Sequence, residues 1–104
     1  MEKENNVLED EQVLGGDIRL VGFSILDSDE MLVVKKIVGN YVRDFSDTLD
    51  DYKGLDVYLD EHEEDYTIEL DLEFGDTLES VSVDHENVFV GLDNGLKEME
   101  ELIV

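Results

Sequence analysis

The sequence predicts an α+β domain whose elements follow the order strand, helix, strand, strand, strand, helix. Two segments repeat apolar residues at three- and four-residue steps, which is typical of helices. Several others alternate apolar and polar residues between turn signals, which is typical of strands. Meandering strands predict a four-stranded, mainly antiparallel sheet with two helices packed on one face and the other face open to solvent.

Residues 1–16 are predicted to form a flexible acidic tail, and residues 17–104 a single domain. The apolar residues of the tail follow no clear period, and a glycine pair ends it. Residues 18–26 carry no acid before Asp27 and are rich in β-forming residues, so we expect the first strand there. Its alternation changes phase at Leu20-Val21, which indicates a bulge or burial on both sides.

The first helix is expected to begin after Asp27, with Glu30 in capping-box spacing, and to run to about Thr48. Gly39 lies inside it and costs roughly 1 kcal/mol relative to alanine, so we expect it to allow a close contact with the sheet. The apolar stripe of this helix comprises Met31, Val34, Val38, Tyr41 and Phe45.

Residues 55–59 and 66–74 alternate apolar and polar side chains and are predicted to be half-buried strands. Gly75-Asp76 is predicted to form a two-residue hairpin turn, followed by a returning strand over residues 78–83. Asp84 is expected to cap the last helix. The apolar stripe of that helix comprises Phe89, Leu92, Leu96, Met99 and Ile103.

The charge is extreme: 30 acidic residues against 7 basic ones give a net charge of −23. One interpretation is a specific role, such as mimicry of a nucleic acid. The other is an acidic surface that keeps a protein hydrated in a salt-rich cell, and the spread of acids along every segment favours it. Self-repulsion at this density destabilises a compact state, and salt screens it, so the fold is predicted to be salt-dependent.

Composition and motifs argue against an enzyme. The chain has no cysteine, no apolar run long enough to span a membrane and no basic, apolar start, so we expect a cytoplasmic protein that does not enter a membrane. The acids of residues 60–65 lack the spacing of a calcium loop, and His62 and His85 match no zinc pattern. The serines lack a nucleophile-elbow context. We therefore expect no catalytic residues, metal or cofactor, and an enzymatic or small-molecule-binding domain is the least favoured class.

One stretch departs from the acidic pattern. From Met31 to Arg43 the chain carries no acid, and Lys36, Asn40 and Arg43 recur at steps that place them on one exposed stripe of the helix. Such a stripe can contact phosphates. The alternative interpretation is that these cations only offset neighbouring acids. The candidate RNA-binding residues are Lys35, Lys36, Asn40 and Arg43, with Arg19 and Lys53 as extensions of the patch.

Several stretches together resemble a known family. They are the strand GLDVYL, the hairpin YTIELDLEFGDTLESVSV, the final segment DHENVFVGLDNGLKEMEEL and the earlier helix DEMLVVKKIVGNYVRDF. In order and pattern they resemble the ribosome hibernation promoting factors, the sigma-54 modulation (S30EA-type) group of ribosome-associated translation inhibitors. The last helix is the most specific part. Its family-like pattern comprises Phe89, Leu92, Asp93, Leu96 and Met99.

The resemblance implies a domain that binds the small ribosomal subunit in the channel used by messenger and transfer RNA. It also implies that lysines and arginines of the two helices and nearby loops face ribosomal RNA, whereas most such positions here carry acids or neutral residues. The alternative is a protein-interaction module, or nucleic-acid mimic, that binds a basic protein with the same fold. Edge strands and the exposed sheet face also leave a homodimer open.

Overall fold

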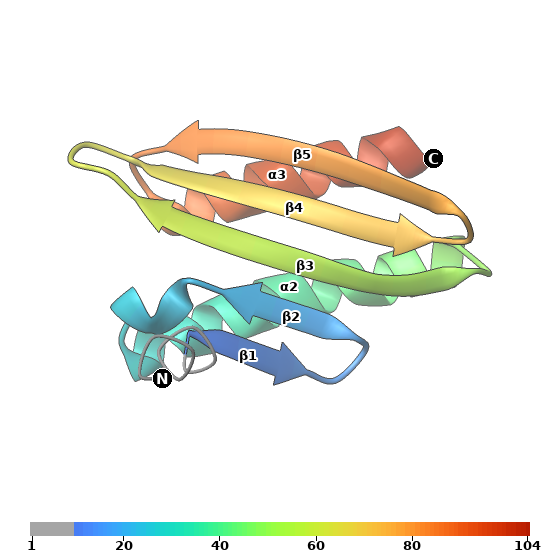
Figure 1. The fold of residues 1–104 in the computed structure, drawn as a ribbon, viewed down its shortest axis with the longest axis horizontal. Coiled ribbons are helices and arrows are strands. Elements are labelled where there is room, and N and C mark those ends of the chain that lie inside the picture. Colours follow the sequence, from blue (N-terminus) through green and yellow to red (C-terminus); the bar gives the residue numbers. More distant parts are fainter. Residues whose placement is uncertain (1–9) are drawn as a thin grey trace, which may run out of the picture.

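The computed structural model describes residues 10–104 and contains a five-stranded mixed sheet and two α-helices (Figure 1). Both helices lie on the same face of the sheet, behind it in Figure 1. In chain order the elements are β1 (Glu11–Leu14), β2 (Ile18–Val21), the 3₁₀ helix η1 (Phe23–Ile25), α2 (Ser28–Thr48), β3 (Tyr52–Glu61), β4 (Tyr66–Phe74), β5 (Thr77–His85) and α3 (Val88–Ile103).

The spatial order of the strands is the same as their order in the chain. β2 and β3 are parallel and are joined through α2, whereas every other neighbouring pair is antiparallel. A parallel pair needs a long crossover, and the 21-residue helix α2 provides it. The expected α+β class and the two helices on one face are confirmed.

The core lies between the sheet and the helices. Alternate residues of β3 and β4 point into it, and α2 and α3 cover them with their apolar stripes. Among residues 10–104 every fully buried side chain of the core is apolar. The largest of them are Phe23, Phe45, Leu20, Leu55, Ile68, Leu70, Leu72, Leu92, Leu96 and Met99.

The predicted number of four strands is wrong, because β1 forms a fifth strand within the segment predicted to be a tail. β1 pairs with β2 in antiparallel register, with Leu14 opposite Ile18 and Val13 opposite Arg19. A four-residue strand has too few positions to show an alternation, so sequence periodicity does not reveal it. Residues 1–9 of the predicted tail lie outside the described residues.

The first predicted strand is shorter than expected. β2 ends at Val21, and Gly22 takes φ +87°, a left-handed conformation that favours glycine. The chain then turns into η1, whose Phe23 is completely buried. The phase change at Leu20-Val21 therefore marks the end of a strand rather than a bulge within a longer one.

The start of α2 confirms the predicted capping box. Asp27 Oδ1 accepts from the backbone N–H of Glu30 at 2.8 Å, and Glu30 Oε1 accepts from the N–H of Asp27 at 2.9 Å. The expectation for Gly39 is wrong, because a Cβ at that position would meet no heavy atom of residues 10–104 within 4 Å apart from its chain neighbours and the backbone of α2. Gly39 therefore serves no close contact with the sheet.

The close helix–sheet approach occurs in α3 instead. A Cβ added at Gly95 would lie 2.8 Å from Val83 Cγ2, and one added at Gly91 would lie 2.7 Å from Ile68 Cδ1. The cap of this helix also differs from the prediction: Asn87 Oδ1 accepts from the N–H groups of Phe89 and Val90, at 2.9 and 3.1 Å. Asp84 lies within β5 and does not cap the helix.

The hairpin between β4 and β5 forms as predicted. Phe74 pairs with Thr77 around a two-residue turn, and Gly75 takes φ +56°. The register continues without interruption to the far end, where Tyr66 lies opposite His85. Two nine-residue strands thus make a long, regular ribbon at one side of the sheet.

Candidate nucleic-acid interface

The predicted cationic stripe lies on the outer side of α2, away from the sheet. Lys35, Lys36, Asn40 and Arg43 are all exposed, whereas Met31, Val34, Val38, Val42 and Phe45 are buried on the opposite side of the helix. Because α2 is a continuous helix of 21 residues, Lys36, Asn40 and Arg43 project from the same side at one- and two-turn spacing. We call Lys35, Lys36, Asn40 and Arg43 the α2 strip.

The cations of the α2 strip form no ion pair within residues 10–104. The two salt bridges there both involve Arg19, and no carboxylate lies within 4.0 Å of Lys35, Lys36 or Arg43. Acids occur on the helix only before and after the strip, at Asp29 and Glu30 and then from Asp44 onward. Direct pairing with acids of residues 10–104 therefore does not account for these cations.

Two apolar residues adjoin the α2 strip and were missed by the sequence reasoning. Leu32 is 66% exposed and Val33 is 44% exposed. On a helix, Leu32 neighbours Lys35 and Lys36, three and four positions on. The exposure of Leu32 and Val33 could have been predicted from the sequence, because both lie outside the three- and four-residue steps of the buried stripe.

Arg19 does not extend the α2 strip, because it lies on the open face of the sheet, opposite the helices. Its neighbours in β2, Ile18 and Leu20, point into the core, so Arg19 points the other way. Its guanidinium contacts Glu11 Oε2 at 2.9 Å and Asp56 Oδ2 at 3.0 Å, and donates to Tyr58 Oη at 3.2 Å. The hydrogen bond to Glu11, then that to Asp56, raises the pKa of Arg19.

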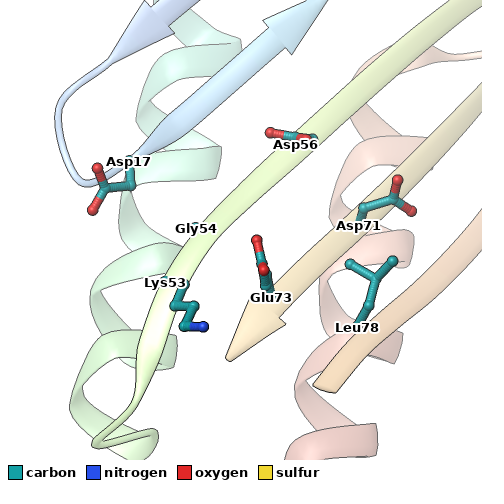
Figure 2. A pocket seen from close by; sticks show the side chains of 7 residues that line it. All are labelled: Asp17, Lys53, Gly54, Asp56, Asp71, Glu73 and Leu78. Carbon is teal, nitrogen blue, oxygen red and sulfur yellow. The ribbon is translucent and has the colours of Figure 1, made fainter. Parts of the chain in front are cut away.

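Lys53 also lies on the open face of the sheet. It lines a hollow of about 440 Å³ with Asp56, Asp71 and Glu73, and Figure 2 shows these side chains in front of the strands while the helices lie behind. The other lining residues are Asp17, Gly54 and Leu78. The structure therefore separates the six candidate residues: four are together on α2, and Arg19 and Lys53 are on the opposite side of the molecule.

The open face is dominated by carboxylates. The cross-strand registers place Asp56 directly opposite Asp71, and Glu69 between Tyr58 and Ser82. Like charges directly opposite each other are destabilising, so this arrangement favours an environment that screens them. The acids that point to this face are Glu11, Asp56, Asp60, Glu69, Asp71, Glu73 and Asp84.

The charged turn between β3 and β4 is closed by its own backbone. The N–H of His62 donates to the carbonyl of Asp65 at 2.8 Å, and His62 Nε2 lies 2.8 Å from Thr67 Oγ1. Thr67 Oγ1 donates in turn to Asp84 Oδ1, so His62 is the donor to Thr67. Within residues 10–104 no group of three or more histidines and carboxylates is arranged to hold a metal ion.

The two helices are joined by a polar contact at their interface. Tyr41 Oη donates to Asp93 Oδ1 at 3.0 Å. Lys97, four residues after Asp93 on α3, forms no salt bridge with it within residues 10–104. Burial, and then the hydrogen bond to Asp93, raises the pKa of Tyr41 to about 12.

A comparison of the sequence with models of known protein families and with curated proteins finds no match in either. Over residues 10–104, neither helix is both long enough and apolar enough to cross a bilayer.

Proposed function

We propose that this protein is a non-enzymatic binding protein that contacts ribosomal RNA of the small subunit through the α2 strip. Its role would be that of the translation-inhibiting hibernation factors, in a form adapted to high salt. The observation that carries the proposal is the exposure of Lys35, Lys36 and Arg43 without an ion-pair partner in residues 10–104. The resemblance of the element order and of the last helix to that family supports it.

The distribution of charge indicates from which side of the domain RNA would bind. The α2 strip lies on the helical side, whereas the rows of carboxylates on β3 and β4 lie on the other side of the sheet. RNA that approached the α2 strip would be separated from the open-face acids by the thickness of the domain. It would still pass exposed acids of the helices themselves, among them Asp44, Asp47 and Glu98. At about 1 M salt the Debye length is roughly 3 Å, so the open-face acids would repel such RNA very little.

The test is co-sedimentation with small ribosomal subunits in molar KCl. Changing Lys36 to glutamate should reduce the bound fraction, because it places a carboxylate where a phosphate is expected. Lys53→Glu is the matched control: it makes the same change in charge, but on the open face of the sheet. Binding that falls equally in both variants, or in neither, would contradict a contact through α2.

The triple variant Lys35→Glu, Lys36→Glu and Arg43→Glu should abolish the co-sedimentation. All three side chains are exposed, so the variant should keep its fold. Circular dichroism and the melting temperature in the same buffer check this, so that a loss of binding can be separated from a loss of structure.

A second candidate function rests on the open face of the sheet. Its carboxylates extend across β3 and β4 and include the directly opposed pair Asp56 and Asp71. This surface suits a basic protein that would otherwise bind nucleic acid. In the same experiment, capture by basic proteins but not by ribosomal subunits, weakened by Asp56→Asn with Asp71→Asn and unaffected by Lys36→Glu, would favour this function over the first.

A further inference from the structure

β5 forms one edge of the sheet, and its outer side is unpaired within residues 10–104 (Figure 1). It has nine residues, and its register with β4 runs from Thr77 to His85 without a bulge. The opposite edge, β1, has only four residues. β5 is therefore the edge that offers a long row of free backbone donors and acceptors.

β5 lacks the proline, lysine and bulge that commonly protect an edge strand, and its one inward-pointing charge is Glu79 on the core face. Its sequence, TLESVSVDH, contains no proline, lysine or arginine. Its two acids, Glu79 and Asp84, point to opposite faces of the sheet, so neither face of the strand carries both. An edge with this length and composition is typical of a strand that pairs with another chain.

We propose that β5 pairs antiparallel with β5 of a second copy of this chain, about a two-fold axis at Ser82. The pairing joins the two sheets into one continuous sheet. This proposal does not depend on the proposed function, because the α2 strip belongs to a different element, and the helix that β5 mainly packs against is α3.

Geometry limits where the axis can lie. In a strand, successive side chains point to opposite faces. An axis between two residues would place the core face of one copy beside the open face of the other. The axis must therefore pass through a residue, and each choice of residue gives a different set of cross-strand neighbours.

An axis at Ser82 places aliphatic side chains opposite aliphatic ones and a histidine opposite a carboxylate. On the core face, Val81 lies opposite Val83 of the second copy, and Glu79 lies opposite His85 of the second copy. On the open face, Asp84 lies opposite the hydroxyl of Ser80. Because the interface is two-fold, each of these pairs occurs twice.

A register with the axis at Val83 would pair only residues 81–85 of each strand, and the two registers displaced toward the start of the strand match poorly. An axis at Val81 would place Glu79 opposite Val83, and Leu78 opposite Asp84. An axis at Ser80 would place Glu79 opposite Val81. Each of these last two registers sets a carboxylate against an aliphatic side chain, whereas the register at Ser82 gives each acid of the strand a polar neighbour.

The imidazole of His85 has a free donor for a contact with Glu79 of the second copy. Its Nδ1 accepts from the backbone N–H of Asn87 at 2.9 Å. In the neutral ring the proton is therefore on Nε2, which is left as a donor. Glu79 and His85 are both partly exposed, so neither is held in the core of the single copy.

The net charge of −23 per chain opposes the association of two copies. Salt screens this repulsion, so the dimeric fraction should rise with KCl concentration. Sedimentation equilibrium in low and in molar KCl measures it. A chain that stays monomeric in molar KCl at every concentration tested would overturn the proposal.

The register is tested by single cysteines, since the natural chain has none. With the axis at Ser82, the two copies of Ser82→Cys face each other with a Cα separation of about 4.5–5.5 Å, within disulfide range. The two copies of Ser80→Cys would be about 13 Å apart at roughly 3.3 Å per residue. We expect oxidation to link Ser82→Cys and not Ser80→Cys, and equal linking of both would overturn this register.

The contact between Glu79 and His85 is tested by reversal. His85→Glu would face Glu79 of the second copy twice, and we expect it to weaken dimerisation about fivefold or more. Adding Glu79→Lys restores an opposite-charge pair and should restore the dimer. Adding Glu98→Lys, at an exposed site on α3, makes the same change in net charge and should not restore it. Equal rescue by both second changes would show a general charge effect and would overturn the assigned contact.

Discussion

The hydroxyl of Tyr41 donates to Asp93 Oδ1 at 3.0 Å and so joins α2 to α3. Desolvation by burial, followed by this hydrogen bond, raises the pKa of Tyr41 from 10.0 to about 12. The folded protein therefore holds the phenolic proton more tightly than the unfolded chain does. Below pH 10 the phenol is protonated in both states, and the stabilisation is lost as the pH rises through 12.

Tyr41→Phe is expected to lower the free energy of unfolding near neutral pH by about 1 kcal/mol, because one hydrogen bond is lost. The difference from the natural protein should shrink between pH 10 and pH 12, since only the natural protein has this group to ionise. Urea unfolding at constant high salt, from pH 7 to pH 12, measures both. A difference that stays constant up to pH 12 would show that the raised pKa of Tyr41 does not contribute.

Arg19 joins β1 to β3 through Glu11 and Asp56, so its loss should loosen β1 locally. The guanidinium side chain is 40% exposed, and each exposed ion pair contributes less than about 1 kcal/mol, so Arg19→Met should change global stability little. Hydrogen exchange should nevertheless become faster for the amides of β1 than for those of β4. Lys53→Met is the control, because it removes another cation of the open face. Uniform acceleration across the sheet would contradict this role of Arg19.

Substitution by alanine is expected to change the free energy of unfolding in opposite directions at Gly39 and Gly22. Gly39 lies in the interior of α2 with no heavy atom near its missing Cβ, so Gly39→Ala should stabilise the protein by up to about 1 kcal/mol. Gly22 takes φ +87°, and a Cβ there would overlap the carbonyl oxygen of Leu59, so Gly22→Ala should destabilise by about 2 kcal/mol or more. Thermal melts of the two variants measure the signs. A destabilising Gly39→Ala would mean that Gly39 serves a contact outside residues 10–104.

The melting temperature is expected to rise with salt, because the open face sets Asp56 against Asp71 and adds further acids beside them. For a domain of this size, each 1 kcal/mol shifts the melting temperature by about 4–8 °C, so screening that relieves a few kcal/mol is easily measured. Melts in low and molar KCl give the comparison. Asp56→Asn with Asp71→Asn should reduce the salt dependence, and equal melting temperatures of the natural protein in both buffers would be the contrary result.

The elements with a strong period were predictable from the sequence. The stripe from Met31 to Phe45 gives α2, and the alternation from Tyr66 to Phe74 gives β4, because burial of one face imposes those periods on the residues themselves. The capping box of Asp27 with Glu30 was predictable for a similar reason, since its partners are three residues apart in the chain. Exposure of the α2 strip follows from the same helical period.

Contacts between distant residues were decided only by the tertiary structure. β1 exists because it pairs with β2 and because Arg19 holds Glu11, and four residues carry no periodic signal of this. Arg19 was predicted to extend the cationic patch of the helix, because the sequence shows its charge but not the face of the sheet on which it lies. The close approach of α3 falls at Gly91 and Gly95 rather than at Gly39, because packing distance depends on the facing side chains. A sequence determines local periods and caps, whereas pairing, facing and close approach depend on which remote segments meet.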